Sequence, residues 1–319
     1  MKIGFIGLGN VGFKLANSIL ESGFDLLIND LDKNTGKSLI EKGAKWIETP
    51  KALAQESNIS ITCLPSPSVV SNVLEGSKGL IEGMGPGKLW IEMSTTDDKE
   101  MQRLASLVID KNAFAIEAPV SGGCHRAATG NIAILVGGTR EAFDIAMPAL
   151  SAIGYQILHI GPIGSASVLK VATNYLASTH LVAVGEALMV CKKAGLDLPT
   201  VYEGIKISSG NSFVHETESQ VIMNGSYNIN FTMDLVCKDV GLFEKLAQDM
   251  QVPTEVSPLI TKIFKEGREK YGDRAWSSMI VKRLEDACGE NLRASGYPDE
   301  LVDDTPRRKG YEVIPNNIK

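Results

Sequence analysis

The sequence lacks the features of a disulfide-stapled, zinc-binding or nucleic-acid-binding protein. Its five cysteines are odd in number, widely spaced and never arranged as Cys-x-x-Cys, which argues against a disulfide framework and a zinc site. With 32 basic and 38 acidic residues the net charge is −6, so no basic surface for nucleic acid is indicated. The cysteine number and spacing indicate a reducing compartment as the expected location.

Long uncharged apolar runs are also absent. The longest apolar stretch, residues 168–190, contains Lys170, Asn174, His180 and Glu186, and charged side chains are costly within a bilayer. The first residues lead directly into an apolar segment, without the charged region of a signal peptide or an Arg- and Ser-rich transit leader. The sequence therefore predicts a cytoplasmic protein without a membrane span.

Glycine, by contrast, is abundant. The chain has 31 glycines among 319 residues, against a usual share of about 7%. Hydrophobic residues make up 44% and charged residues 22%, which is ordinary for a globular protein, and the length predicts about two domains. The positions of the glycines are therefore the first feature to examine.

Seven short apolar segments alternate with helical patterns in the first half of the chain. This alternation predicts a parallel sheet covered by helices on both faces, an α/β domain of Rossmann type. The predicted strands are Lys2–Gly7, Phe24–Asn29, Trp46–Ile47, Asn58–Leu64, Lys88–Met93, Ala113–Ala118 and Ile132–Val136.

The pattern changes at the Gly- and Pro-containing segment 161–164. Beyond it the segments have helical periodicity and no strand pattern, so we expect a dinucleotide-binding domain over residues 1–161 and an all-helical domain over 162–319. A helix over Ser165–Ala194 is apolar on most of its circumference and is predicted to be buried on most sides. The polar tail after Gly296 is interpreted as a surface tail, with an arm to a second subunit as the alternative.

A G-x-G-x-x-G motif follows the first predicted strand and opens a helix. In this context the first glycine permits the tight turn, the second lets the backbone approach a pyrophosphate, and the third lets the helix pack closely on the sheet. The helix N-terminus would then face the phosphates with its N–H groups. The predicted cofactor-binding residues of the motif are Gly7, Leu8, Gly9, Asn10, Val11 and Gly12.

Asp30 lies 21 residues after Gly9, at the end of the second predicted strand. An acidic side chain there accepts hydrogen bonds from ribose hydroxyls and repels a 2′-phosphate, which favours NAD over NADP. Asp32 could share this role, and Lys33 could soften the discrimination. A solvated acid at a strand end is the alternative interpretation.

Three further segments carry polar groups that suit a small anionic substrate. Ser121-Gly122-Gly123 offers a hydroxyl and several N–H groups, which could form a nest for a carboxylate. The alternative is that the two glycines only form a turn. Lys170 and Asn174 are four residues apart on one predicted helix, so their side chains share a face. A desolvated lysine can exchange a proton with a substrate near neutral pH. The alternative is a lysine that extends its amine to solvent beside an asparagine that packs between helices. Lys238-Asp239, taken alone, is interpreted as a helix-surface ion pair.

Taken together and in this order, the segments resemble the β-hydroxyacid dehydrogenase family. The resemblance rests on GLGNVGFKLANSIL, EAPVSGGCHRAATG, GPIGSASVLKVATN and KDVGLFEKLA. It implies a Rossmann-type N-terminal domain joined by a long helix to an all-α C-terminal domain. It also implies NAD or NADP as cofactor, with NAD favoured by Asn29-Asp30-Leu31, and a homodimer or homotetramer.

The resemblance assigns roles to residues of this chain. It implies Lys170 as the catalytic acid/base, Asn174 as the group that orients Lys170 and the substrate, and Lys238 near the nicotinamide and the substrate. The substrate carboxylate would lie on Ser121, Gly122 and Gly123, and the cofactor would be lined by Leu64, Pro65 and Thr95.

Three positions depart from the family pattern. Glu117 stands where Asp is usual, Asn131 stands where Thr is usual, and the segment Cys124-His125-Arg126 is bulky where small residues are common. Arg126 could meet a second anionic group on the substrate, and a surface arginine is the alternative. These departures leave the substrate open but not the type of reaction.

The resulting hypothesis is hydride transfer between NAD(P) and a small 3-hydroxy acid, such as 3-hydroxyisobutyrate, or its semialdehyde. Reduction of glyoxylate or of succinic or tartronate semialdehyde, and a non-catalytic dinucleotide-binding sensor, are the alternatives. The chain is shorter than 6-phosphogluconate dehydrogenases, and Lys170 argues against an imine reductase. No metal is expected, since His215-Glu216 is followed at the i+4 position by Ser219 rather than histidine.

Overall fold

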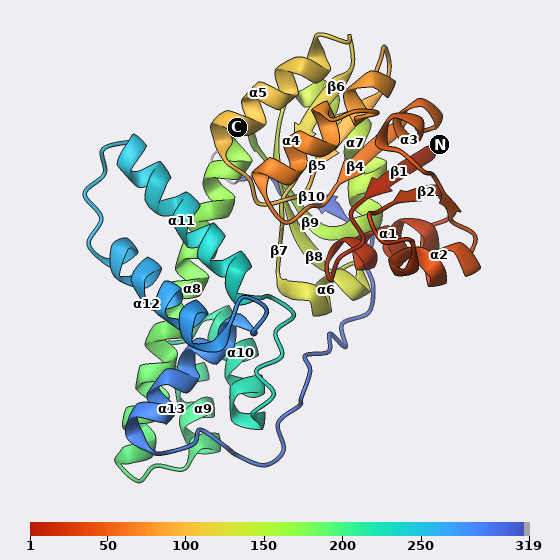
Figure 1. Cartoon of the computed structure of the whole chain (residues 1–319). Helices are drawn as coiled ribbons and strands as arrows, with labels where there is room; N and C mark the ends of the chain where they lie inside the picture. Colours follow the sequence, from red (N-terminus) through yellow and green to blue (C-terminus); the bar gives the residue numbers. More distant parts are fainter. Residues whose placement is uncertain (316–319) are drawn as a thin grey trace. The chain divides into compact units, whose positions relative to one another are not determined.

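The computed structural model describes residues 1–315, which form two compact units (Figure 1). The N-terminal unit contains Met1–Lys170 together with the chain from Asp303 onward, and the helical unit is Val171–Val302. The predicted boundary at residue 161 and the assignment of the tail to the helical domain therefore differ from this division. The physical reason is that the start of the long helix and the tail from Asp303 onward make hydrogen bonds with the Rossmann-type sheet and its helices.

One sheet forms the centre of the N-terminal unit. Its strands are ordered β10-β9-β8-β6-β5-β4-β1-β2-β3, and β8 runs antiparallel to β6 and β7 while the other pairs are parallel. The strands are β1 (Lys2–Ile6), β2 (Asp25–Asn29), β3 (Lys45–Trp46), β4 (Ile59–Thr62), β5 (Leu89–Glu92), β6 (Phe114–Glu117), β7 (Val120–Ser121), β8 (Ile132–Gly137), β9 (Gly154–Gly161) and β10 (Tyr311–Glu312).

Helices cover both faces of this sheet, as the alternation of strands and helices predicts. Successive residues of a strand point to opposite faces, so Phe5 of β1 packs into one apolar cluster and Ile6 into the other. The helices are α1 (Gly12–Glu21), α2 (Lys37–Glu41), α3 (Pro50–Glu56), α4 (Pro67–Glu75), α5 (Asp98–Ile109), α6 (Gly123–Thr129) and α7 (Arg140–Ile153), with 3₁₀ turns at Lys33–Gly36 and Leu80–Gly83.

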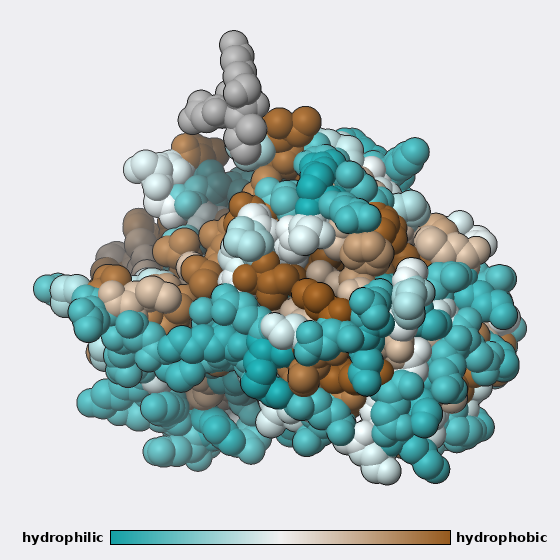
Figure 2. Space-filling model, turned by 90° about the horizontal axis from the view of Figure 1, so that it is seen from above, coloured by the Kyte–Doolittle hydropathy of each residue, from teal (hydrophilic) through white to brown (hydrophobic). Residues whose placement is uncertain are grey.

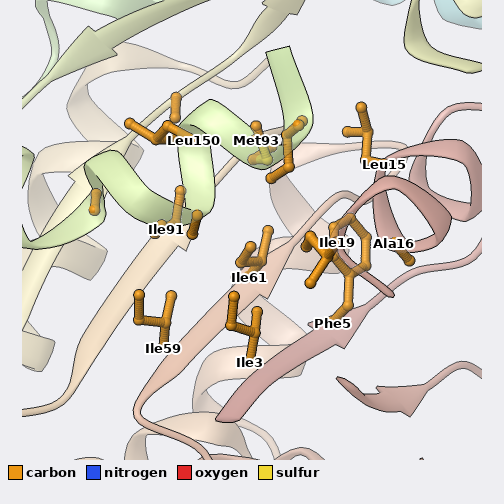
Figure 3. Packing of buried hydrophobic residues seen from close by; sticks show 14 of the residues in the cluster. Ile3, Phe5, Leu15, Ala16, Ile19, Ile59, Ile61, Ile91, Met93 and Leu150 are labelled. Carbon is orange, nitrogen blue, oxygen red and sulfur yellow. The ribbon is translucent and has the colours of Figure 1, made fainter. Parts of the chain in front are cut away.

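The first of these clusters fixes α1 on the strands that carry the glycine motif. Figure 3 shows Ile3 and Phe5 of β1 beside Ile59 and Ile61 of β4, with the apolar side of α1 facing them. Burial of this face holds the start of α1 directly above the end of β1. The residues of α1 that are fully buried there include Leu15, Ala16 and Ile19.

The helical unit is built on the long helix α8 (Ser165–Lys193), which begins in the N-terminal unit. Its other helices are α9 (Leu198–Lys206), α10 (Phe213–Asn224), α11 (Met233–Asp249), α12 (Val256–Tyr271) and α13 (Lys282–Cys288), with a 3₁₀ turn at Ser277–Val281. A separate apolar cluster holds them together, and α11 packs along α12.

One expectation about the second half of the chain is wrong. Strand β10 occurs after residue 165, where no strand is predicted, because an edge strand of two residues has no alternation to recognise. Strand β9, which lies between β10 and β8, is also missed, because only two of its eight residues are buried. The helix α8 is buried on most sides, as predicted, and exposes one stripe that includes Leu176, 51% exposed, and Val190, 68% exposed. Within the described residues no helix is long and apolar enough to cross a membrane. Figure 2 shows one face of the molecule, largely hydrophilic with scattered hydrophobic areas.

Candidate active site

The glycine motif forms a turn that requires glycine at two positions and leaves open space at the third. Gly7 has φ +97°, and a Cβ there would lie 2.3 Å from the carbonyl oxygen of Cys63. A Cβ at Gly12 would lie 2.0 Å from the carbonyl oxygen of Gly7, whereas one at Gly9 would meet no atom of the described chain within 4 Å. Val11, the N-cap residue of α1, has no side chain that could cap the N–H groups of the helix. The open space at Gly9 beside uncapped N–H groups fits a pyrophosphate.

Asp30 is part of the same turn. Its Oδ2 accepts a hydrogen bond from the Leu8 N–H at 2.6 Å, and its Oδ1 accepts one from the Asp32 N–H at 3.1 Å. Lys33, which could soften a preference for NAD, pairs with Glu48 at 3.3 Å. The carboxylate at the end of β2 therefore holds the glycine turn in place.

A buried network joins the loops that the resemblance assigns to the cofactor. Glu92, fully buried at the end of β5, accepts hydrogen bonds from the Thr62 hydroxyl and from the Ser94 N–H, the latter at 2.7 Å. The Ser94 hydroxyl in turn accepts the Leu64 N–H at 2.7 Å. This network ties the loop after β4, with Leu64 and Pro65, to the loop after β5, with Thr95. Glu92 and Ser94 belong to no motif recognisable in the sequence, so their part in this network was not predicted.

The predicted carboxylate nest lies between β7 and α6. Ser121 ends β7, where it pairs with Ala133 of β8, and Gly122 and Gly123 have φ of +127° and +84°. Glycine is required for these backbone angles. A Cβ at Gly122 would lie 3.2 Å from Cδ of Arg126, so the aliphatic part of Arg126 lies over this glycine.

Glu117 occupies the position where the family pattern has Asp, and its carboxylate binds the start of α8. Oε1 accepts the N–H groups of Gly164 at 2.6 Å and Ala166 at 2.8 Å, and Oε2 accepts the N–H and the hydroxyl of Ser167. Burial raises the pKa of Glu117, and these hydrogen bonds oppose that rise. The carboxylate therefore caps the helix that carries Lys170 one turn further on.

A Cβ at position 137 would lie 2.3 Å from Oε1 of Glu117. Gly137, paired with Glu117 across β6 and β8, therefore provides the room for the longer side chain.

Lys170 and Asn174 lie one turn apart on α8, as the sequence predicts. Lys170 is only 7% exposed. Asn174 donates a hydrogen bond from Nδ2 to Oδ2 of Asp239 at 2.5 Å, and Lys238 pairs with Oδ1 of Asp239 at 2.8 Å. Asp239 is 1% exposed, so the Lys238–Asp239 pair is not the solvated surface pair that the segment alone predicts. Asp239 joins Asn174 of α8 to Lys238 of α11, a role that the sequence analysis missed.

His215 has a structural role in α10. Its ring is fully buried, with Nε2 2.9 Å from the Tyr202 carbonyl oxygen and Nδ1 3.1 Å from the Ser219 hydroxyl. Over residues 1–315 no three potential ligands come together as a metal site would need.

Comparison with known proteins gives matches along nearly the whole chain. Residues 2–161 match the family described as the NAD binding domain of 6-phosphogluconate dehydrogenase, and residues 164–284 match that described as NAD-binding of NADP-dependent 3-hydroxyisobutyrate dehydrogenase. The 2-(hydroxymethyl)glutarate dehydrogenase of Eubacterium barkeri is 32% identical over 92% of this chain and 97% of its own.

A mouse relative and a solved structure agree with these matches. The mitochondrial 3-hydroxyisobutyrate dehydrogenase of Mus musculus is 29% identical over 87% of this chain and 85% of its own. A crystal structure of 3-hydroxyisobutyrate dehydrogenase from Salmonella typhimurium superposes with a TM-score of 0.81 at 26% identity, covering 89% of this chain and 99% of that one. The predicted Rossmann-type and all-helical fold is thereby confirmed. The chain belongs to the β-hydroxyacid dehydrogenase family and is an NAD(P)-dependent oxidoreductase of hydroxy acids.

Proposed function

We propose that this chain oxidises a small 3-hydroxy acid, with Lys170 as the catalytic acid/base. The observation that carries the proposal is a lysine only 7% exposed, one helical turn before an asparagine that is held by the buried Asp239. One turn of helix places Lys170 and Asn174 on the same face, where a lysine amine can act as a general acid/base toward a bound hydroxyl group.

In the forward direction Lys170, in its neutral form, takes the proton of the substrate hydroxyl, and in reduction it returns that proton. Its ammonium stabilises the negative charge that develops on the alkoxide oxygen. Asn174 orients the substrate and Lys170, and Asp239 fixes Asn174 and Lys238. The nicotinamide cofactor, when bound, accepts or supplies the hydride.

The substrate carboxylate is proposed to bind Ser121, Gly122 and Gly123, and Arg126 to bind a second anionic group. The packing of Arg126 over Gly122 supports this, because it brings the guanidinium stem to the nest itself. A relative named for 2-(hydroxymethyl)glutarate, a dicarboxylic acid, also supports it. Arginine is suited to carboxylates because its planar fork can donate two parallel hydrogen bonds.

For the cofactor we favour NAD over NADP. The carboxylates of Asp30 and Asp32 at the end of β2 support this choice, since they would repel a 2′-phosphate. Free cysteines at all five positions support a reducing, cytoplasmic location. The family and the exposed apolar residues of α8 support a homodimer or homotetramer. Physiological reduction of a semialdehyde is the alternative direction of the same reaction.

A spectrophotometric screen of cofactor reduction tests the proposal. The candidates are 3-hydroxyisobutyrate, 3-hydroxypropionate, 4-hydroxybutyrate, serine, glycerate, threonate and 2-(hydroxymethyl)glutarate, each with NAD and NADP. We expect Lys170→Ala to lower kcat at least about a hundredfold while cofactor binding survives. Lys193→Ala, at the exposed end of the same helix, is the matched control and should keep wild-type kcat.

Two results would contradict parts of this proposal. A Lys170→Ala enzyme with kcat within a few-fold of wild type would remove the catalytic assignment, and no turnover of any candidate would favour the non-catalytic sensor.

Arg126→Ala should raise KM for dicarboxylates more than for monocarboxylates. An equal effect on both classes, or none, would exclude Arg126 as the second anion site.

A further inference from the structure

The C-terminal segment crosses back from the helical unit and docks on the N-terminal unit. Beyond α13 the chain continues without a helix, joins the N-terminal unit at Asp303 and ends in β10, which pairs with β9 along Gln156 and Ile157 (Figure 1). The second family match ends at residue 284, and the Salmonella structure is covered to 99% of its length by 89% of this chain. This chain therefore carries residues that this relative lacks.

Asp303 binds the turn between α6 and β8. Its Oδ2 accepts hydrogen bonds from the Thr129 hydroxyl and from Nδ2 of Asn131, the latter at 2.9 Å. Nδ2 of Asn131 also lies 2.8 Å from the Thr305 carbonyl oxygen. Partial burial alone would raise the pKa of Asp303, but the hydrogen bonds from Thr129, Asn131 and Thr305 lower it to about 2. The carboxylate is therefore charged at neutral pH and holds this turn by charge-assisted hydrogen bonds.

Arg307 anchors the same segment to two helices of the N-terminal unit, α1 and α7. Its guanidinium donates to the carbonyl oxygens of Ser18 in α1, at 2.9 Å, and of Ala152 in α7. Its side chain also covers Gly130, where a Cβ would lie 3.0 Å from Nε of Arg307. Further along, Glu312 accepts two hydrogen bonds from Arg140, at 2.6 and 2.9 Å.

The docked segment acts at the far end of the helix that begins at the carboxylate nest. Helix α6 starts at Gly123 and ends at Thr129, so the nest and the Asp303 contacts lie at opposite ends of seven helical residues. The chain enters α6 from Ser121, which is paired to β8, and leaves it through Asn131 into β8. A short helix fixed at its last turn has a fixed first turn, because its backbone hydrogen bonds make it rigid along its axis.

We propose that Asp303 is a positioning residue for substrate binding, acting through Thr129 and Asn131 on the nest at the start of α6. The proposal explains why Asn131 replaces the threonine usual in the family: its amide can donate to both Asp303 and Thr305, which a threonine hydroxyl cannot do. It rests on the proposed function in one respect only, namely that Ser121, Gly122 and Gly123 bind the substrate.

Steady-state kinetics of Asp303→Ala with the best substrate of the screen test this proposal. Losing the charge-assisted hydrogen bonds should raise KM for the hydroxy acid about tenfold, with KM for the cofactor and kcat within about twofold of wild type. Asp304→Ala is the matched control, since Asp304 is the exposed neighbour. If both variants change KM equally, or if KM for the cofactor rises as much as KM for the acid, the proposal is overturned.

Asn131→Thr supplies a second test, because it removes the amide that binds Asp303. The double variant should show a KM little higher than either single variant, since both changes break one interaction. Fully independent effects would contradict the proposal.

Hydrogen exchange gives a readout that needs no activity. We expect Asp303→Ala to speed amide exchange in residues 122–131 but not in α1, whereas Asp304→Ala should change neither. Unchanged exchange in residues 122–131 would overturn the proposal whatever the substrate is, while failure of the proposed function would instead be seen as a wild-type enzyme without hydroxy acid turnover.

Discussion

At the scale of single residues, Glu117 connects the end of β6 with α8, the helix that carries Lys170. Its carboxylate accepts the N–H groups at the start of α8, and each group left unsatisfied would cost about 1–3 kcal/mol. Glu117→Ala should therefore lower kcat at least about tenfold, because a displacement of roughly 1 Å at a reacting group is enough to slow a reaction by that factor or more. The measurement is kcat, together with the Kd for NAD.

The control for Glu117→Ala is the loss of a different carboxylate cap. Asp197 caps α9 through the Thr200 N–H at 3.1 Å, so Asp197→Ala should lower the melting temperature but leave kcat unchanged. Similar kcat values for the two variants would mean that Glu117 has only a structural role.

The sequence predicts residues whose function depends on their immediate neighbours. Gly7 and Gly12 are recognisable because a Cβ at either position would clash with a backbone carbonyl oxygen, and Gly7 also has a positive φ. The roles of Glu117 and Asp239 were missed, because their partners lie 47 to 50 and 65 residues away in the sequence. No local pattern records a hydrogen bond over such a separation.

At the scale of elements, α10 contains a carboxyl group whose pKa is raised by burial. Oε2 of Glu218 is shielded from solvent and has no hydrogen-bond partner among residues 1–315, and burial raises the pKa of this group to about 8. Since the folded state binds this proton more tightly than the unfolded state, its contribution to stability falls as pH rises from the ordinary value of 4.5 through about 8.

Glu218→Gln should therefore stabilise the protein increasingly at alkaline pH. The amide keeps the shape of the side chain without a charge to bury, so its gain in melting temperature should be small near pH 4.5 and clear near pH 9. Thermal unfolding at both pH values, with Glu216→Gln on the same helix as control, makes the measurement. A gain in melting temperature that is equal at both pH values would contradict a titrating Glu218.

Elements differ in how far the sequence predicts them. Helix α8 is predicted within one residue of its observed end, because a long apolar period without breakers has few alternatives. Strand β10 has two residues, and its partner β9 lies about 155 residues earlier, so neither length nor local periodicity identifies it. The polar composition of the tail indicates a surface segment but does not show where it docks.

At the scale of the whole molecule, the chain crosses between its two units twice. It passes once through α8 at residues 170 and 171 and again at residues 302 and 303. Length alone predicts two domains, but not this second crossing, because the crossing depends on Asp303, Arg307 and Glu312 finding partners on distant elements.

The helical unit also presents an apolar stripe that a single chain leaves exposed. Leu176, Ala183 and Val190 of α8 are exposed and follow one another at intervals of seven residues, the spacing of a helix–helix seam. Because water contact of such a stripe is unfavourable, we expect it to be covered by a second copy of the chain. Light scattering with size-exclusion chromatography should then give a mass of at least two chains.

Leu176→Glu combined with Val190→Glu should reduce that mass to a single chain, since two carboxylates cannot be desolvated in an apolar seam. Ile207→Glu replaces an apolar residue outside α8 that is even more exposed, at 86%, and should leave the mass unchanged. An oligomer that persists in the double variant would place the contact on another surface. A wild-type chain that is monomeric would mean that the stripe has no partner of its own kind.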